Sequence, residues 1–176
     1  MTSVKDPAIP PLISIVGSSG VGKTTLLEKL IPELTHRGFR IGTIKHDVHG
    51  FEMDKPGKDS WRHKHAGAMV SMISSPYQIG MVRDVDYDHR PEELFPFLSD
   101  LDIILTEGYK QKGKIKLEVF RPEVNPEPLC RDDKHLIALV SDTHRNLGVP
   151  RFSTKDTQGL ADFLINRFDL TPSDKE

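Results

Sequence analysis

The chain of 176 residues is long enough to bury a hydrophobic core as one domain, and its single cysteine, Cys130, excludes an internal disulfide framework. Its net charge of -2 argues against a nucleic-acid-binding protein, which needs a clustered basic face. The sequence has no apolar run long enough for a membrane span, and its first residues lack a signal peptide. We therefore expect a cytoplasmic protein that binds neither nucleic acid nor membrane.

Hydrophobic patterning divides the chain into short elements. Residues 1–11 and 171–176 are predicted to be a flexible lead-in and tail of a single domain over residues 1–176. The predicted elements between them are, in chain order, a strand at Leu12–Val16, a helix at Thr24–His36, a strand at Arg40–Lys45, a short helix at Ser60–His65, strands at Met69–Ile73 and Gln78–Val82, a helix at Pro91–Leu98, strands at Leu101–Thr106, Ile115–Phe120 and Leu136–Val140, and a last helix at Thr157–Phe168. Pro32 is expected to kink the first long helix, and Gly38 to cap it.

Apolar strands that alternate with helices predict an α/β fold with a mostly parallel sheet. Ligands of such sheets bind at the carboxyl ends of the strands. Three predicted strands end in residues suited to a site, namely Gly17, Glu107 and the pair Ser141-Asp142. Two long segments have no periodic pattern. His46–Asp59 is polar and is interpreted as a functional loop, and Arg121–Asp133 is interpreted as a surface loop.

The loop after the first strand matches the pattern G-x-x-x-x-G-K-[ST] in full. The matching residues are Gly17, Ser18, Ser19, Gly20, Val21, Gly22, Lys23 and Thr24. Glycines let the backbone curl around a phosphate, its amides point inward as donors, and the next helix adds its positive end. We predict that this P-loop and Thr25 bind the triphosphate of a nucleotide. Lys23 would reach the β- and γ-phosphates, and Thr24 would be a ligand of Mg²⁺.

Two carboxylates are candidates for the magnesium site. Glu107 directly follows an apolar strand, which is where such metal-linked acids stand, and with Lys23 and Thr24 it completes the candidate catalytic set. The alternative is an ordinary strand-end carboxylate that faces water. Asp54 opens a D-x-x-G sequence that ends at Gly57 and resembles a GTPase switch element. That match is short, and a solvated acidic loop is its alternative.

Two clusters of basic side chains have simpler explanations than a site. The histidines are His46, His49, His63 and His65, and their spacing fits no recognised zinc pattern, so surface histidines explain them better. The lysines are Lys110, Lys112, Lys114 and Lys116. A run of this kind is usually a solvated face, although it can also meet an anionic partner.

Several motifs beyond the P-loop form a specific combination. They are Thr24-Thr25-Leu26-Leu27, Lys29-Leu30-Ile31-Pro32, Lys45-His46-Asp47-Val48-His49, Asp54-Lys55-Pro56-Gly57-Lys58-Asp59-Ser60, Ala66-Gly67-Ala68 and Thr106-Glu107-Gly108-Tyr109-Lys110. Together they resemble the molybdopterin-guanine dinucleotide biosynthesis protein B (MobB) family. The similarity extends from Ile13 to about Phe168, and it is far more specific than the P-loop alone.

The resemblance implies a P-loop NTPase-type fold with a hairpin insertion. It implies a GTP-binding protein with weak, magnesium-dependent GTPase activity. It also implies an accessory role in attaching GMP to molybdopterin, beside a guanylyltransferase of the MobA type and in contact with molybdopterin. A homodimer is implied as well, with an extended hairpin from each subunit in the interface.

One departure from ordinary GTPases concerns the base. The chain has no N-K-x-D sequence, the usual guanine reader. Asp142 follows a predicted strand and can place a carboxylate on a guanine edge, although a surface turn is the simpler interpretation. The choice of guanine over adenine therefore rests on the family resemblance.

Two other functions are compatible with the same motif. A P-loop small-molecule kinase would share Lys23, Thr24 and a strand-end acid, and would also need an arginine-rich lid. Arg83 and Arg90 can belong to a lid, but they do not form a clear cluster. The other alternative is a scaffold that uses the nucleotide only to set its shape.

Overall fold

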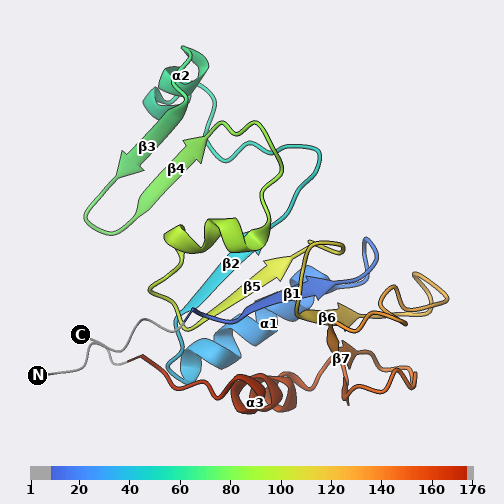
Figure 1. The fold of residues 1–176 in the computed structure, drawn as a ribbon. Helices are drawn as coiled ribbons and strands as arrows, with labels where there is room; N and C mark the ends of the chain where they lie inside the picture. Colours follow the sequence, from blue (N-terminus) through green and yellow to red (C-terminus); the bar gives the residue numbers. More distant parts are fainter. Residues whose placement is uncertain (1–8, 174–176) are drawn as a thin grey trace, which may run out of the picture. The chain divides into compact units, whose positions relative to one another are not determined.

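The computed structural model describes residues 9–173 and divides them into two compact units (Figure 1). The first unit contains residues 9–46 and 90–173, and the second contains residues 47–89. Residues 1–8 of the predicted lead-in and residues 174–176 of the predicted tail lie outside the described residues. The single domain predicted over residues 1–176 stays a prediction.

The first unit is built on a six-stranded sheet in which all strands are parallel. Its strands are β1 (Leu12–Val16), β2 (Ile41–Lys45), β5 (Ile103–Glu107), β6 (Lys116–Val119), β7 (Leu136–Val140) and β8 (Arg151–Phe152). They lie in the order β2-β5-β1-β6-β7-β8, so β2 and β8 are the edge strands and β5 inserts between β2 and β1. The predicted parallel α/β sheet is confirmed. The two-residue strand β8 was missed because it is too short to show a period.

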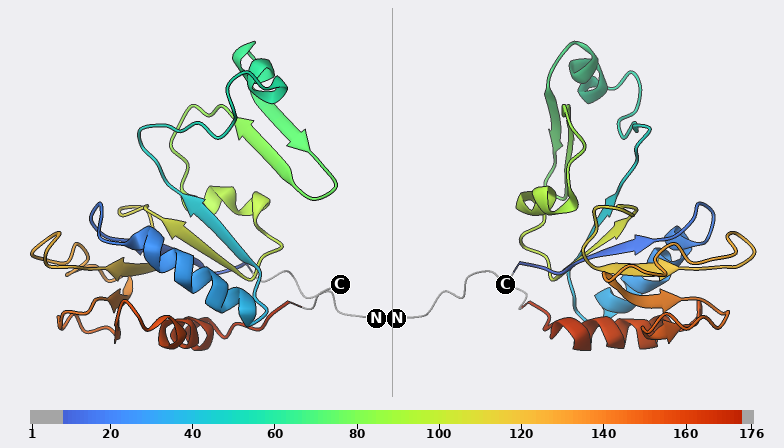
Figure 2. Two further views of the ribbon diagram at one scale, coloured as in Figure 1. Left: turned by 180° about the vertical axis from the view of Figure 1, so that it is seen from behind. Right: turned by 45° about the vertical axis from the view of Figure 1, so that its right-hand side comes forward.

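Two helices cover one face of this sheet, α1 (Lys23–His36) and α3 (Thr157–Phe168). They pack against each other and lie on the same side of the sheet (Figures 1 and 2). The side chains between the layers are apolar and form one core: Ile13, Ile15, Leu27, Leu30, Leu34, Leu105, Leu117, Val119, Ala138, Leu160 and Leu164 are among them. Helix α1 continues through Pro32, and Gly38 follows its end with φ +92. Gly38 therefore occupies the left-handed position of a helix stop, as predicted.

The other face of the sheet is also buried, and it combines a small apolar cluster of Val16, Cys130 and Leu136 with several polar side chains. Its side chains include Ser14, Thr106, Lys116 and Glu118, all buried. Thr106 and Ser14 form a hydrogen bond of 3.0 Å between their hydroxyls. Because buried polar groups are costly without partners, each of these residues needs such a contact.

The loop between β6 and β7 supplies the partners for the two charged residues. The carboxylate of Glu118 accepts hydrogen bonds from the backbone N–H groups of Leu129 (2.6 Å) and Cys130 (2.9 Å). The ammonium of Lys116 lies 2.6 Å from a carboxylate oxygen of Asp133 and lowers the pKa of that carboxyl. Lys116 is thus a buried structural cation, and the prediction of a solvated lysine face is wrong for this residue. The predicted surface loop 121–133 is therefore anchored to the sheet by its contacts with Glu118 and Lys116.

The second unit is a β-hairpin with one short helix. Strands β3 (Val70–Ser74) and β4 (Ile79–Arg83) pair antiparallel, and α2 (Asp59–His65) packs on β3. Ser71 fixes this packing, because its hydroxyl donates to the carbonyl of Ser60 at 3.0 Å. Residues 47–58 have no helix or strand, in agreement with the predicted loop.

The segment at Pro91–Phe97, labelled η1, is a 3-10 helix where a regular helix was predicted. Pro96 within it has no backbone N–H to donate, which shortens the run of hydrogen bonds that a helix needs. Across residues 9–173, none of the helices combines the length and the apolar character that a membrane crossing requires.

Candidate functional site

The glycine-rich loop, Gly17–Thr24, joins the end of β1 to the start of α1. Its three glycines all have positive φ: +144 at Gly17, +74 at Gly20 and +104 at Gly22. A Cβ on Gly17 would lie 2.5 Å from the carbonyl oxygen of Val119, so the loop passes too close to β6 for any side chain there. Glycine is needed for both reasons, and the loop leads into a helix N-terminus, where backbone amides can face an anion.

Lys23 lies folded over this loop. Its ammonium donates to the carbonyl oxygens of Gly17 (3.2 Å) and Ser18 (2.9 Å). Burial lowers the pKa of the ammonium, the charge of Glu107 opposes that shift, and the charge of Lys110 adds to it. The ammonium is therefore held at the loop by neutral acceptors, which an anionic oxygen can replace.

Thr24 and Glu107 meet at the carboxyl edge of the sheet. The hydroxyl of Thr24 lies 3.0 Å from both carboxylate oxygens of Glu107. The contact forms because β5 pairs directly with β1, with Glu107 opposite Ile15. A hydroxyl and a carboxylate are hard oxygen ligands of the kind that Mg²⁺ prefers. The structure thus brings together three residues predicted for one site, Lys23, Thr24 and Glu107.

The second acid predicted for the metal, Asp54, belongs to the second unit. Its carboxylate accepts a hydrogen bond of 2.8 Å from the backbone N–H of Lys55. Its role at the metal stays a prediction. In the described part of the chain, no three or more His, Cys, Asp or Glu side chains form a group that could hold a metal ion.

Asp142 follows β7 and forms hydrogen bonds with residues that follow β8. Its carboxylate accepts hydrogen bonds from the hydroxyl of Ser153 (2.6 Å) and from the backbone N–H (3.0 Å) and hydroxyl (2.6 Å) of Thr154. These bonds lower its pKa to about 2, so the carboxylate is charged at neutral pH. A carboxylate has about four acceptor positions, so one is left for a ligand. Guanine reading by Asp142 remains a prediction.

Sequence reasoning missed several residues around the loop. Tyr109 is buried with φ +52, a rare backbone conformation for a bulky residue, and its ring stacks on His46 at 4.2 Å. Asn125 donates to the hydroxyl of Ser18 at 3.3 Å. The guanidinium of Arg121 lies beside Gly22. For Tyr109, the sequence signal was its place after the strand-end pair of Glu107 and glycine. Arg121 and Asn125 lie in a loop with no recognisable motif.

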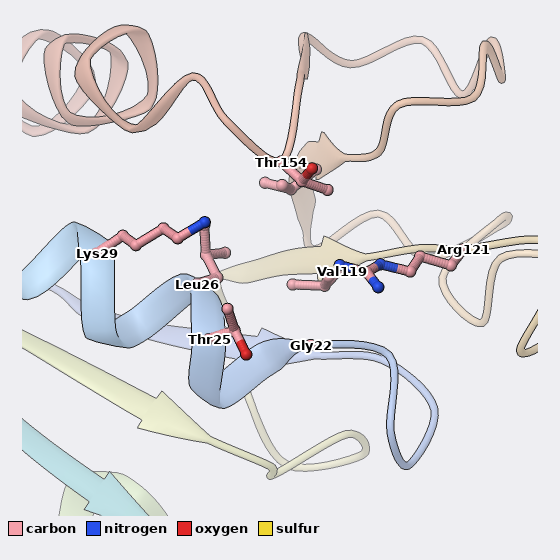
Figure 3. A pocket seen from close by; sticks show the side chains of 8 residues that line it. Gly22, Thr25, Leu26, Lys29, Val119, Arg121 and Thr154 are labelled. Atoms are coloured by element: carbon pink, nitrogen blue, oxygen red, sulfur yellow. The ribbon is translucent and has the colours of Figure 1, made fainter.

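A small pocket opens between α1 and the ends of β6, β7 and β8 (Figure 3). Its lining consists of Gly22, Thr25, Leu26, Lys29, Val119, Arg121, Val140 and Thr154. Its volume is about 40 Å³, which admits a few water molecules and is far below that of a typical ligand pocket.

A parallel sheet with a glycine-rich loop at the carboxyl end of its central strand, followed by a lysine, a hydroxyl and a strand-end acid, defines a P-loop NTPase-like fold. The family model described as molybdopterin guanine dinucleotide synthesis protein B (MobB) matches residues 12–142. The chain belongs to the MobB family.

Relatives and solved structures agree with this assignment. The chain is 42% identical over 164 residues to the molybdopterin-guanine dinucleotide biosynthesis adapter protein of Escherichia coli, covering 88% of this chain and 91% of that protein. The protein of the same name from Haemophilus influenzae is 36% identical, with coverage of 89% and 88%. The crystal structure of Bacillus subtilis MobB matches with a TM-score of 0.71 and 25% identity, over 93% of this chain and 99% of that one. Another MobB crystal structure gives a TM-score of 0.68 at 28% identity, over 90% and 99%.

Proposed function

We propose that this protein is a GTP-binding adapter of molybdopterin-guanine dinucleotide biosynthesis with weak, magnesium-dependent GTPase activity. The observation that carries the proposal is the hydroxyl of Thr24 at 3.0 Å from both oxygens of Glu107, beside Lys23 and the glycine-rich loop. Family membership supports the biosynthetic role, because the curated relatives from Escherichia coli and Haemophilus influenzae are named adapter proteins of that process.

The geometry suits a triphosphate that lies along the P-loop. The amides of the loop and the N-terminus of α1 would face the phosphate oxygens. Lys23 would exchange its two carbonyl acceptors for β- and γ-phosphate oxygens, which are charged and so bind more strongly. Thr24 would ligate Mg²⁺ directly, with Glu107 as its acidic partner, and the bound ion would neutralise charge on the β- and γ-phosphates.

The weak activity and the partner are also part of the proposal. Phosphoryl transfer depends on positioning and charge stabilisation, and the sequence offers no obvious residue that orients the attacking water, so hydrolysis should be slow. An adapter protein acts together with another protein. A guanylyltransferase of the MobA type, which transfers GMP to molybdopterin, is the partner that the family relationship favours, with molybdopterin as a further ligand.

A titration and a product assay test this function together. The protein should bind GTP in the presence of Mg²⁺ more tightly than ATP, and the affinity should respond to addition of the transferase. Incubation with GTP and candidate acceptors should yield only GDP and phosphate, slowly. A phosphorylated acceptor would identify a small-molecule kinase instead, and GTP binding without any product would identify a scaffold.

The loop 46–59 is expected to respond to the nucleotide. Residues 47–58 have no helix or strand, and Val48, Phe51 and Met53 are exposed, so little burial opposes its conformational entropy. Its amides should exchange hydrogen fast in the free protein, slower with GDP, and slowest with a non-hydrolysable GTP analogue and Mg²⁺. Mass spectrometry of deuterium uptake measures this. Equal protection in all three states would show that the loop is not a switch.

The hairpin of the second unit is proposed to form a homodimer interface. Helix α2 packs on β3 at the face of Ser71, and the opposite face presents the apolar residues Val70, Met72 and Ile79 to solvent. A two-stranded hairpin is marginally stable alone, and exposed apolar faces mark interaction sites.

The oligomeric state tests this interface. Sedimentation velocity should show a dimer, and Met72→Glu should shift it to the monomer because a charge would be buried in an apolar contact. Val124→Glu is the control, since Val124 is exposed in the first unit. A dimer that survives Met72→Glu would place the interface elsewhere.

A further inference from the structure

The strand order determines how a nucleotide bound at the P-loop would be oriented across the sheet. The proposed magnesium partner Glu107 lies on β5, on one side of β1, and a Mg²⁺ ion held by Thr24 and Glu107 would neutralise charge on the β- and γ-phosphates. Strands β6, β7 and β8 lie on the other side of β1. With the γ-phosphate end held near β5, the α-phosphate and the nucleoside must extend over the carboxyl ends of β6 to β8.

Arg121 lies just beyond the carboxyl end of β6, the strand next to β1 on the side away from Glu107. It follows β6 by two residues, and a Cβ on Gly22 would lie only 3.3 Å from its Nη2. Figure 3 shows the guanidinium turned back toward Gly22 and Val119. The loop backbone of this motif cradles the α- and β-phosphates, so the guanidinium would lie close to these two phosphates. Its place on the β6 side of the loop, away from Glu107, favours the α-phosphate.

Positive charge near Arg121 comes from more than one source. The first turn of α1 contains no acidic residue, and the N-terminal end of a helix is itself positive. Lys29, on the next turn of α1, reaches toward the same pocket (Figure 3). Within residues 9–173, the side chains of Arg121 and Lys29 form no hydrogen bond or ion pair, unlike the paired cations Lys116 and Arg37.

The small pocket between these cations limits what else can bind there. With a volume of about 40 Å³, it cannot enclose a purine base or a ribose, which would lie across its mouth. Little binding energy is then available from burial of the nucleoside. Contacts to the phosphates then become important for affinity, and a planar guanidinium can bind two phosphate oxygens at once.

We propose that Arg121 binds the α-phosphate of the nucleotide, an inference that rests on the proposed function of the P-loop. The α-phosphate is present in GTP and in GDP alike. Arg121 therefore contributes equally to the affinity for substrate and product, whereas Lys23 and Glu107 favour the triphosphate. The consequence is that loss of the Arg121 side chain should not change the preference of the protein for GTP over GDP.

Matched titrations with GTP and GDP in the presence of Mg²⁺ test the role of Arg121. Arg121→Ala should weaken both nucleotides by the same factor, about tenfold or more, as expected for a lost charge-assisted contact. Arg121→Lys should recover part of the loss, since it restores the charge but not the two-oxygen geometry. Arg131→Ala is the control, because Arg131 lies in the same loop, is exposed and pairs with Glu127 at 3.7 Å. It should bind both nucleotides as the unmodified protein does.

Each other outcome has a distinct meaning. Unchanged affinities in Arg121→Ala overturn the inference while the P-loop assignment stands. A loss confined to GTP also overturns it, because it would place the guanidinium at the γ-phosphate. If the unmodified protein binds neither nucleotide, the proposed function itself fails. Thermal unfolding of the ligand-free Arg121→Ala variant should match the unmodified protein, since the side chain has no partner to lose among the described residues.

Discussion

Replacement of Lys23 by alanine should reduce the affinity for GTP at least tenfold and leave the fold intact. The ammonium would bind charged β- and γ-phosphate oxygens, and such contacts contribute about 1.5–3 kcal/mol each. In the free protein its two acceptors are backbone carbonyls that water can satisfy in the variant. GDP should lose less affinity than GTP because it lacks one of the two phosphates that Lys23 would contact.

Isothermal titration with GTP and GDP measures both affinities. Lys134→Ala is the matched control, since Lys134 is an exposed lysine in the loop between β6 and β7. Its GTP affinity should equal that of the unmodified protein. A Lys23→Ala protein with undiminished GTP affinity would remove the P-loop assignment.

Glu107→Gln should weaken the binding of Mg²⁺ in the nucleotide complex by about 10- to 100-fold, the range found for residues that support metal ligands. Glutamine keeps the shape and one acceptor oxygen for the hydroxyl of Thr24 but removes the negative charge. The effect should appear in the dependence of GTP affinity on magnesium concentration. Binding measured in EDTA should change little.

Asp54→Asn is the comparison for the second acid. Asp54 opens the D-x-x-G sequence, so its variant should alter magnesium dependence less than Glu107→Gln does. If only the Asp54 variant changes that dependence, Glu107 is not the metal-linked acid. The Thr24–Glu107 contact is then a feature of the nucleotide-free loop alone.

The outcome at individual residues shows where sequence reasoning succeeds. The strand at Leu12–Val16, the loop glycines and α1 were predicted within a residue, because positive φ at three glycines and an apolar stripe are local requirements. Glu107 was chosen from its place at the end of an apolar run. The lysine run was misjudged, because Lys116 looks the same in sequence as its exposed neighbours and differs only in facing Asp133.

The sequence by itself determined the P-loop motif, the α/β class and the family, because these depend on residue types at fixed short spacings. Tertiary structure alone decided that Thr24 touches a carboxylate 83 positions away and that β6 lies beside β1. It also decided that Arg121 approaches Gly22. Strand order is set by how helices and loops pack over the whole sheet, and no local pattern encodes it. Because β1 pairs with β5 on one side and with β6 on the other, Glu107 and Arg121 lie on opposite sides of the P-loop. This arrangement sets the proposed orientation of the nucleotide.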